Sequence, residues 1–466
     1  MTTSLSRLAL ATVIACCLLS TPALRAEIAY PIEQCCSLCP EAANPDAYDT
    51  DTLKVNKLLL AGADNWLFRS SLDLHETFQL KPTAITALRR FRTELAKQGT
   101  ELLLVYHPTR GLMNHRGVDD HRPEPYNYPL AAENYRLALQ KIRSTGIITP
   151  DLSRLLTDAG STDFHFRRDA HWTPAGARKA AKLVADRIKQ LDLYPTIPTV
   201  DFVTERVGLR GTSGGHQNAA YLLCGIRYSN QYVDEFETHQ LTQSSDSLDL
   251  FTDQPQPQVV VVGTSFSDSK LRYNFVGFLQ QFLAVDILNV AVAGGGIAGS
   301  LTQYFASEDF QTSPPKLIIW EVPGYTPLYN SKVYRQLVPR ITNGCANQTP
   351  ELTSTIKLAR GDNEALFNGD GMVKNITSGN YLVDIQFSDP AIKRLDATVW
   401  YHNLRKERLV LKHRDRVDGQ GRFVFELKAD THWKDLIFTS LEVTIDDTYP
   451  KDLTLTASLC KRDDIP

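Results

Sequence analysis

Residues 259–268 read VVVVGTSFSD, in which four consecutive valines precede a Gly-x-Ser. A short, continuous run of β-branched residues that ends in a glycine predicts a strand buried on both faces, which is typical of a parallel sheet. Between about Leu58 and Tyr325 such runs alternate with helical stretches, so we predict an α/β layered domain. The other clear strands are LLLVY at Leu102–Tyr106, ILNVAVA at Ile287–Ala293 and LIIW at Leu317–Trp320.

The clearest helix follows Thr173, a residue type that caps helix N-termini well. Pro174 would occupy the first helical position, where its missing N–H costs nothing. Apolar residues then recur at helical spacing and predict one face that packs on the core. They are Ala177, Ala180, Leu183, Val184 and Ile188.

After Cys345 the pattern changes to short alternating runs separated by Gly, Asn and Asp. This pattern predicts an antiparallel β-sandwich of about 120 residues. We place a parallel-sheet domain at residues 27–340 and the sandwich at residues 345–466, with the boundary between Asn330 and Cys345. The predicted strands are Tyr381–Phe387, Ala397–Tyr401, Arg408–Leu411, Arg422–Leu427 and Leu441–Ile445.

The composition excludes several classes of protein. The chain has 466 residues, of which 42% are hydrophobic and 22% charged, values that are ordinary for a globular protein and exclude a disordered or fibrous one. Lys and Arg number 50 against 53 Asp and Glu, a formal net charge of −3. That balance is too even for the electrostatic binding that dominates nucleic-acid affinity, so we expect no nucleic-acid partner.

The first 26 residues have the pattern of a secretory signal peptide. Arg7 precedes an apolar run at Leu8–Leu19, and a small-residue region ending at Ala26 follows. The alternative is a membrane anchor, but an apolar run of about a dozen residues is short against the roughly 20 needed to cross a bilayer. We therefore expect cleavage near Ala26 and export of the mature chain.

Six cysteines remain after residue 26, an even number in a compartment that permits disulfides. We predict a bridge between Cys345 and Cys460, which would close a long loop and contribute about 4 to 5 kcal/mol in the chain-entropy model. Residues 35–39 contain a CxxC that might be expected to be redox-active or to bind zinc. No second CxxC or His pair at metal spacing accompanies it, so we expect no metal site and predict a bridge from Cys39 to Cys224.

Ser265 is the first candidate for catalysis, because it follows a buried strand and such sites collect at the carboxyl edge of open α/β sheets. If a helix starts after Ser265, its N–H groups and dipole would point at the serine and help to hold an oxyanion. The alternative is an ordinary loop or N-cap serine, since a lone Gly-x-Ser is a weak motif.

Asp169 and His171 are the second candidate pair. A serine nucleophile needs a general base, and a carboxylate beside the imidazole Nδ1 would fix its tautomer and stabilise the imidazolium. His171 precedes the predicted helix at Thr173, where a loop can present it. The alternative is structural, with Asp169 capping the helix and His171 half-buried.

Together these motifs carry a resemblance. Asp169-x-His171-Trp172, upstream of Gly263-x-Ser265-Phe266 and with NWLF at residues 65–68, resembles the SGNH-hydrolase-like alginate O-acetyltransferases of the AlgX/AlgJ family. The resemblance covers most of the mature chain. It implies a circularly permuted SGNH-hydrolase-like domain, a carbohydrate-binding sandwich and a catalytic triad of Ser265, His171 and Asp169.

The same resemblance implies which groups form the oxyanion hole. The turn Gly294-Gly295-Gly296 is similar to the block that donates an oxyanion N–H, which we assign to Gly295, and glycines allow the backbone to approach a ligand closely. A phosphate cradle is the alternative, but the Lys and Ser/Thr of a P-loop are missing. Residues 320–325 occupy the place of the Asn-containing block of ordinary SGNH enzymes, where Tyr325 or a nearby N–H would be the second donor.

A basic, aromatic surface is predicted in the sandwich. Residues 393–414 contain seven Lys and Arg against two acidic residues, which suits an anionic polymer. Arg394, Thr398 and Trp400 fall on one strand face, where an aromatic ring beside cations would hold a uronate sugar. Arg405 and Arg408 complete the predicted site. The alternative is a solvated strand face with Trp400 in the core.

The function implied by the resemblance is O-acetylation of alginate at mannuronate hydroxyls in the periplasm. Ser265 would form an acetyl-serine intermediate, with no cofactor. No coenzyme A motif is visible, so the resemblance implies a membrane acyltransferase as donor, besides other alginate export proteins as partners. An exported esterase with the same triad and a non-catalytic polysaccharide-binding scaffold remain alternatives.

Overall fold

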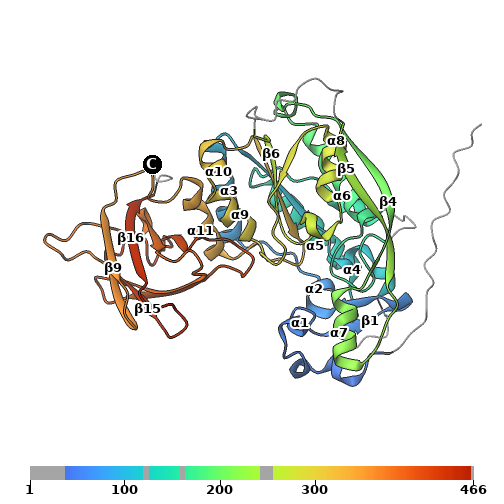
Figure 1. Cartoon of the computed structure of the whole chain (residues 1–466), viewed down its shortest axis with the longest axis horizontal. Coiled ribbons are helices and arrows are strands. Elements are labelled where there is room, and N and C mark those ends of the chain that lie inside the picture. Colours follow the sequence, from blue (N-terminus) through green and yellow to red (C-terminus); the bar gives the residue numbers. More distant parts are fainter. Residues whose placement is uncertain (1–36, 119–124, 158–162, 242–255, 463–466) are drawn as a thin grey trace, which may run out of the picture. The chain divides into compact units, whose positions relative to one another are not determined.

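The computed structural model describes residues 37–118, 125–157, 163–241, 256–330 and 332–462 in full, and the backbone of residue 331. The predicted signal peptide, residues 1–26, and the cysteines Cys35 and Cys36 lie outside these ranges. Figure 1 shows the described elements, which belong to one compact unit.

A four-stranded parallel sheet forms the core of the first domain. Its order is β3-β8-β6-β7, and each neighbouring pair is parallel. All four predicted strands are present, and the α/β architecture is confirmed. The strands are β3 (Glu101–His107), β8 (Leu317–Pro323), β6 (Val259–Val262) and β7 (Ile287–Asn289).

The fourth strand is shorter than predicted because it ends at Asn289 rather than Ala293. The side chain of Asn289 accepts the N–H of Ala291 at 3.1 Å and donates to the carbonyl of Ser267 at 2.8 Å. These local bonds end the regular strand at Asn289, and the following apolar residues belong to a loop whose Val290 and Val292 N–H groups still donate to the carbonyls of Val261 and Gly263.

Helices cover both faces of the sheet, which explains the continuous apolar runs in its strands. Alternate residues enter different cores: Val260 and Val262 pack with α3 and α5, whereas Val259 and Val261 pack with α6 and α8. The α-helices of this domain are α1 (Asp51–Lys54), α2 (Ser70–Asp73), α3 (Pro82–Lys97), α4 (Arg110–Met113), α5 (Tyr128–Arg143), α6 (Pro174–Ile188), α7 (Gly215–Cys224), α8 (Phe275–Leu283), α9 (Gly299–Phe305), α10 (Glu308–Thr312) and α11 (Ser331–Ile341).

Helix α6 begins as predicted. Thr173 is its N-cap and accepts the N–H of Gly176 at 3.1 Å, with Pro174 in the first turn. The predicted apolar face is buried, apart from the half-buried Leu183. Two small antiparallel sheets were not predicted: β1 (Leu59–Ala61) with β2 (Leu67–Arg69), and β4 (Phe202–Thr212) with β5 (Gln231–Gln240).

The C-terminal region is a sandwich of two four-stranded antiparallel sheets, ordered β10-β15-β12-β13 and β14-β11-β16-β9. The five predicted runs all form strands. Strands β9, β10 and β16 escaped prediction because Thr, Ser, Asn and Asp occupy their outward positions. The strands are β9 (Leu352–Lys357), β10 (Gly361–Phe367), β11 (Tyr381–Phe387), β12 (Arg394–Tyr401), β13 (Lys406–Lys412), β14 (Arg422–Glu426), β15 (Phe438–Ile445) and β16 (Thr454–Lys461).

Helix α11 connects the two domains. It contacts α3 and β14, and Figure 1 places it beside the sandwich. Arg335 of α11 donates to the buried Glu407 at 2.7 Å and to the carbonyl of Glu426. Arg90 of α3 forms a second ion pair with the Glu426 carboxylate. The predicted boundary segment is therefore an ordered helix held by buried ion pairs.

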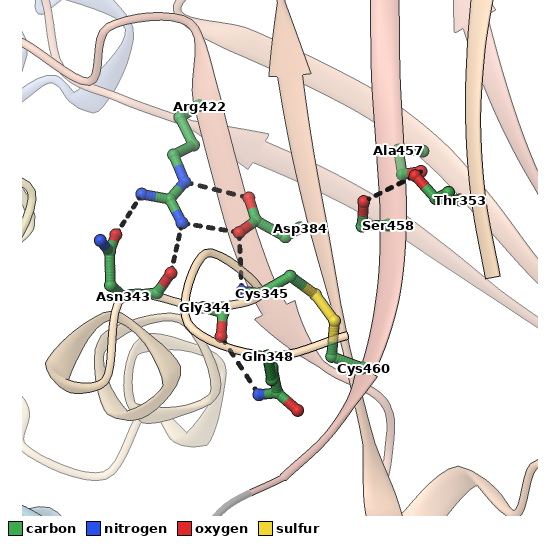
Figure 2. The surroundings of a disulfide bond; sticks show 10 residues. All are labelled: Asn343, Gly344, Cys345, Gln348, Thr353, Asp384, Arg422, Ala457, Ser458 and Cys460. Atoms are coloured by element: carbon green, nitrogen blue, oxygen red, sulfur yellow. Dashed lines mark hydrogen bonds and ion pairs between the residues drawn. A yellow bond between two sulfur atoms is a disulfide. The ribbon is translucent and has the colours of Figure 1, made fainter. Parts of the chain in front are cut away.

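Both predicted disulfides are present, Cys39–Cys224 and Cys345–Cys460. Figure 2 shows that the second lies beside the ion pair of Asp384 and Arg422. Asp384 also accepts the backbone N–H of Cys345 at 3.0 Å. Cys345, which follows the end of α11 at Ile341, is thus fixed to strands β11 and β16 of the sandwich.

Among the described residues, every helix is too short or too polar to cross a membrane.

We predict that the Cys345→Ala/Cys460→Ala double variant lowers the free energy of unfolding of the sandwich by about 4 kcal/mol, because the bridge closes a loop of 115 residues. Chemical unfolding followed by tryptophan fluorescence would measure this loss. Cys39→Ala/Cys224→Ala is the control, since it leaves the sandwich bridge intact. A free Cys345 thiol in non-reducing peptide maps of exported protein would contradict the assignment.

Candidate active site

Asp169, His171 and Ser265 meet at the carboxyl edge of the parallel sheet. The Ser265 Oγ lies 2.7 Å from His171 Nε2, and His171 Nδ1 lies 2.5 Å from Asp169 Oδ1. A carboxylate can only accept, so the neutral imidazole carries its proton on Nδ1 and presents Nε2 as the acceptor for the serine hydroxyl. This is the tautomer that a general base for Ser265 needs.

Ser265 is presented by a tight turn after β6, closed by the bond from Ser267 N–H to the Thr264 carbonyl at 3.2 Å. An α-helix beginning directly after Ser265, which would have pointed its dipole at the serine, is not present. The next α-helix, α8, begins at Phe275. Within the described part of the chain, the N–H of Ser265 makes no hydrogen bond, so it can donate to an oxyanion without help from a helix dipole.

Aromatic rings hold the imidazole of His171. Phe266 and Tyr273 lie with ring centroids 4.8 and 5.2 Å from it. The adjacent Trp172 is fully buried and donates to the carbonyl of Phe266 at 2.9 Å. Since Thr173 caps α6, the structural alternative in which Asp169 caps that helix is excluded.

Asp169 is held as an ionised carboxylate. Its Oδ1 also accepts the His171 N–H at 3.0 Å, and its Oδ2 accepts the N–H of Gly215, the first residue of α7, at 2.7 Å. Burial opposes ionisation, but His171 and these N–H groups lower the pKa of Asp169 well below its usual range. The carboxylate therefore remains charged throughout the working pH range of an enzyme.

A buried charge cluster, which sequence reasoning missed, fixes the segment that carries Asp169. Arg110 is 1% exposed and donates to the backbone carbonyls of Phe166, Arg167 and Asp169. Asp73, 0% exposed, lies 3.3 Å from the Arg110 Nε and also pairs with Arg69 at 2.7 Å. Burial would raise the pKa of Asp73, but Arg69, His216 and Arg110 lower it well below its ordinary value.

Glu321, at the end of β8, is a second missed residue. It is 0% exposed and accepts the Thr264 N–H at 2.8 Å, the Ser267 hydroxyl at 3.3 Å and His107 Nε2 at 3.1 Å. Thr264 and Ser267 flank the nucleophile, so Glu321 holds the turn on both sides of Ser265. Its position in the strand was visible in the sequence, but its orientation toward this turn was not.

The two predicted oxyanion donors, Gly295 and Tyr325, are less available for this role than the N–H of Ser265. The N–H of Gly295 is already donated to the carbonyl of Val292 at 3.0 Å, so the structure does not leave it free as expected. Tyr325 lies beside Arg69, which forms a hydrogen bond with its hydroxyl, and burial raises the pKa of Tyr325. The free N–H of Ser265 is the better placed donor, and the role of Tyr325 stays a prediction.

The predicted glycan face lies on the outer surface of β12. Arg394, Thr398 and Trp400 alternate with buried residues, so Trp400 is half-buried on this face and does not lie in the core as the alternative had it. Binding of a glycan by this face stays a prediction. Arg408 of β13 is directly opposite Thr398. The indole of Trp400 donates to Glu442 at 2.7 Å, and Arg394 pairs with Asp396.

Arg405 lies apart from this face. Its guanidinium donates to the carbonyl of His432 at 2.7 Å and stacks over Trp433 at 4.5 Å. Trp433 in turn contacts the inward-facing Tyr401. The cation that lies beside Trp400 on the outer face is Lys406 rather than Arg405. Its Nζ lies 4.5 Å from the centroid of the indole ring.

No group of three or more His, Cys, Asp or Glu side chains is arranged to hold a metal ion in the described ranges.

Comparison with known proteins agrees with this geometry. Residues 59–324 match the family model described as an SGNH hydrolase-like domain, acetyltransferase AlgX, and residues 344–466 match a C-terminal carbohydrate-binding module. The chain belongs to the AlgX family. Its permuted SGNH-hydrolase-like fold with a following carbohydrate-binding sandwich is thereby confirmed.

Individual relatives support the AlgX assignment. The alginate biosynthesis protein AlgX of Pseudomonas aeruginosa is 41% identical over 425 residues, which cover 91% of this chain and 89% of the relative. The solved structure of P. aeruginosa AlgX matches with a TM-score of 0.82, covering 91% of this chain and 99% of that one. The probable alginate O-acetylase AlgJ of the same species is 29% identical over 283 residues, 57% of this chain and 69% of AlgJ.

We predict that Glu321→Gln lowers kcat for acetyl-ester hydrolysis about 100-fold with little change in KM, since small displacements of a nucleophile cost about that much. The NH2 group of the glutamine would face donors that now donate to the carboxylate, namely the Thr264 N–H and the hydroxyls of Thr264 and Ser267. Steady-state kinetics on a chromogenic acetyl ester would measure this effect. Glu364→Gln, an acid on strand β10 of the sandwich, is the control; equal kcat for Glu321→Gln and wild type would contradict the role.

Proposed function

We propose that this protein O-acetylates mannuronate hydroxyls of alginate in the periplasm through an acetyl-serine intermediate. The observation that carries the proposal is the chain of contacts from Ser265 through His171 to the ionised Asp169. The relatives named for alginate biosynthesis and O-acetylation give the substrate class. The two disulfides support an oxidising compartment.

The first half-reaction acetylates the enzyme. His171 Nε2 takes the Ser265 proton while Oγ attacks the acetyl carbonyl of the donor. The N–H of Ser265 donates to the oxyanion that forms. As that intermediate collapses, the bond to the donor's oxygen breaks and His171 returns the proton to the departing alcohol. Asp169 stabilises the transient imidazolium.

The second half-reaction transfers the acetyl group. His171 takes the proton of a mannuronate hydroxyl, whose oxygen attacks the acetyl-serine carbonyl, and Ser265 leaves with that proton. The sugar gains an acetate ester and the enzyme is restored. We assign the donor to a membrane acyltransferase partner, because the sequence shows no coenzyme A motif, and other alginate export proteins are proposed partners.

The decisive assay supplies mannuronate oligomers and a soluble acetyl ester to the purified protein and follows the products by mass spectrometry. Acetylated oligomers support the transferase. Free acetate alone would indicate an esterase, in which water replaces the sugar, and the absence of any turnover would indicate a polysaccharide-binding scaffold.

We predict that Ser265→Ala lowers acetyl-ester turnover by at least about 1,000-fold, because the nucleophile is lost, and that His171→Ala behaves alike since triad members act as a unit. The melting temperature should stay near that of wild type, because the serine side chain fills little volume. Ser269→Ala, in the same loop, serves as the matched control. Normal turnover by Ser265→Ala would refute the triad.

We further predict that Trp400→Ala weakens binding of polymannuronate three- to tenfold, since the ring offers a stacking surface worth about 1 kcal/mol. Arg408→Gln should weaken binding chiefly at low salt, because exposed charges are screened beyond roughly 10 Å at 0.1 M ionic strength. Calorimetric titrations at two salt concentrations would separate these effects. Undiminished binding by both variants would mean that the outer face of β12 is only a solvated surface.

A further inference from the structure

Strand β13 carries outward cations along an edge of the sandwich. It pairs only with β12 in its sheet. Lys406, Arg408 and Lys412 are exposed and alternate with the buried Glu407, Leu409 and Leu411. Alternation along a strand places these cations on one side, with the exposed Val410 between Arg408 and Lys412. The cations lead from Trp400, opposite Lys406, toward the end of β13.

The cations continue beyond the strand, at Arg414 and Arg416. Both side chains are exposed, and neither forms an ion pair or hydrogen bond with any residue that the structure describes. The acids of the same loop, Asp415 and Asp418, form no ion pair with them. Two guanidinium groups are therefore available to an outside anion.

The loop that bears these arginines is docked on the first domain. Val417 is 1% exposed, and a Cβ added to Gly299, the first residue of α9, would lie 2.6 Å from its Cγ2. The N–H of Asp418 donates to the side chain of Gln303 in α9 at 3.2 Å. The turn itself is closed by the bond from Val417 N–H to the Arg414 carbonyl at 2.9 Å. The arginines are consequently held in place by their own loop.

Both arginines lie against the glycine turn beside the nucleophile. A Cβ on Gly296 would lie 3.5 Å from Arg414 Nε, and one on Gly294 would lie 4.0 Å from Arg416 Cδ. Gly294 and Gly296 have positive φ values of 78° and 68°, a backbone conformation that favours glycine at both positions.

The glycine turn is in turn bonded to the segment that carries Ser265. The N–H of Val292 donates to the carbonyl of Gly263 at 3.1 Å, and the N–H of Ala293 donates to Asp268 at 3.0 Å. Hydrogen bonds thus tie the glycine turn, against which the two arginine side chains lie, to the turn that carries Ser265.

We propose that Arg414 and Arg416 form a carboxylate-binding subsite for uronate units that neighbour the sugar being acetylated. Arginine binds carboxylates with two parallel N–H bonds, which fixes orientation as well as position. The cations of β13 lead the polymer from the outer face of the sandwich to this subsite. The inference rests on the proposed function for its substrate class.

The test is the Arg414→Gln/Arg416→Gln double variant of the whole chain. Its affinity for mannuronate oligomers, measured by calorimetry at low salt, should fall about tenfold. Binding of neutral β-1,4-mannan oligomers and hydrolysis of a small acetyl ester should be unchanged, because neither needs a carboxylate partner. Lys357→Gln/Lys451→Gln, which removes two charges around β9 and the turn before β16, is the matched control.

Equal affinity of the double variant and wild type for mannuronate oligomers overturns the subsite, whatever the transfer assay shows. A parallel loss of ester hydrolysis also overturns it, since the arginines would then act on the fold of the glycine turn. If wild type binds mannuronate oligomers through these arginines but transfers no acetyl group, the proposed function fails while the subsite stands.

Discussion

The guanidinium of Arg110 is the constraint on which the geometry of the active site depends. It donates to three backbone carbonyls of the segment before His171 and to the carbonyl of Leu67 at 2.5 Å. A cation so deeply buried is stable only if a charge compensates it, and Asp73 supplies that charge. Burial nevertheless lowers the pKa of Arg110 to about 10, which leaves it protonated at neutral pH. The segment 166–169 is thus shaped by a fixed cation rather than by regular secondary structure.

The nucleophile turn has its own support, independent of Arg110. Glu321 binds residues on both sides of Ser265 from below the turn, at the end of the central sheet. The acid that orients the imidazole and the acid that holds the nucleophile therefore belong to separate networks. Strand β8 positions Glu321, and the Arg110 cluster positions the segment that carries Asp169. Two rigid supports that meet at a 2.7 Å contact between Ser265 and His171 give a preorganised site.

The sequence allowed prediction of the features that follow from local pattern. Four apolar runs gave the sheet, and Thr173 with Pro174 gave the start of α6. The antiparallel pair of β4 and β5, between which helix α7 lies in the sequence, escaped because its strands show no strict alternation and lie half-exposed. The Arg110 cluster escaped for another reason: an isolated arginine or aspartate in a sequence is usually on the surface, and only tertiary structure shows which are buried. Its members at residues 69, 73, 110 and 216 share no motif.

Ion pairs and packed side chains join the two domains, which bears on what the sandwich can contribute. A module on a flexible linker would raise the local concentration of polymer but leave each sugar's orientation free. Here Arg335 and Arg90 form ion pairs with the buried Glu407 and Glu426 across the junction, and the buried Val417 packs on α9. Breaking such a pair would leave a buried carboxylate without a compensating charge, which costs several kcal/mol of stability. The sandwich is thus joined to the parallel-sheet domain by ion pairs and a buried apolar contact, so an acceptor bound as proposed would be oriented by contacts with both domains.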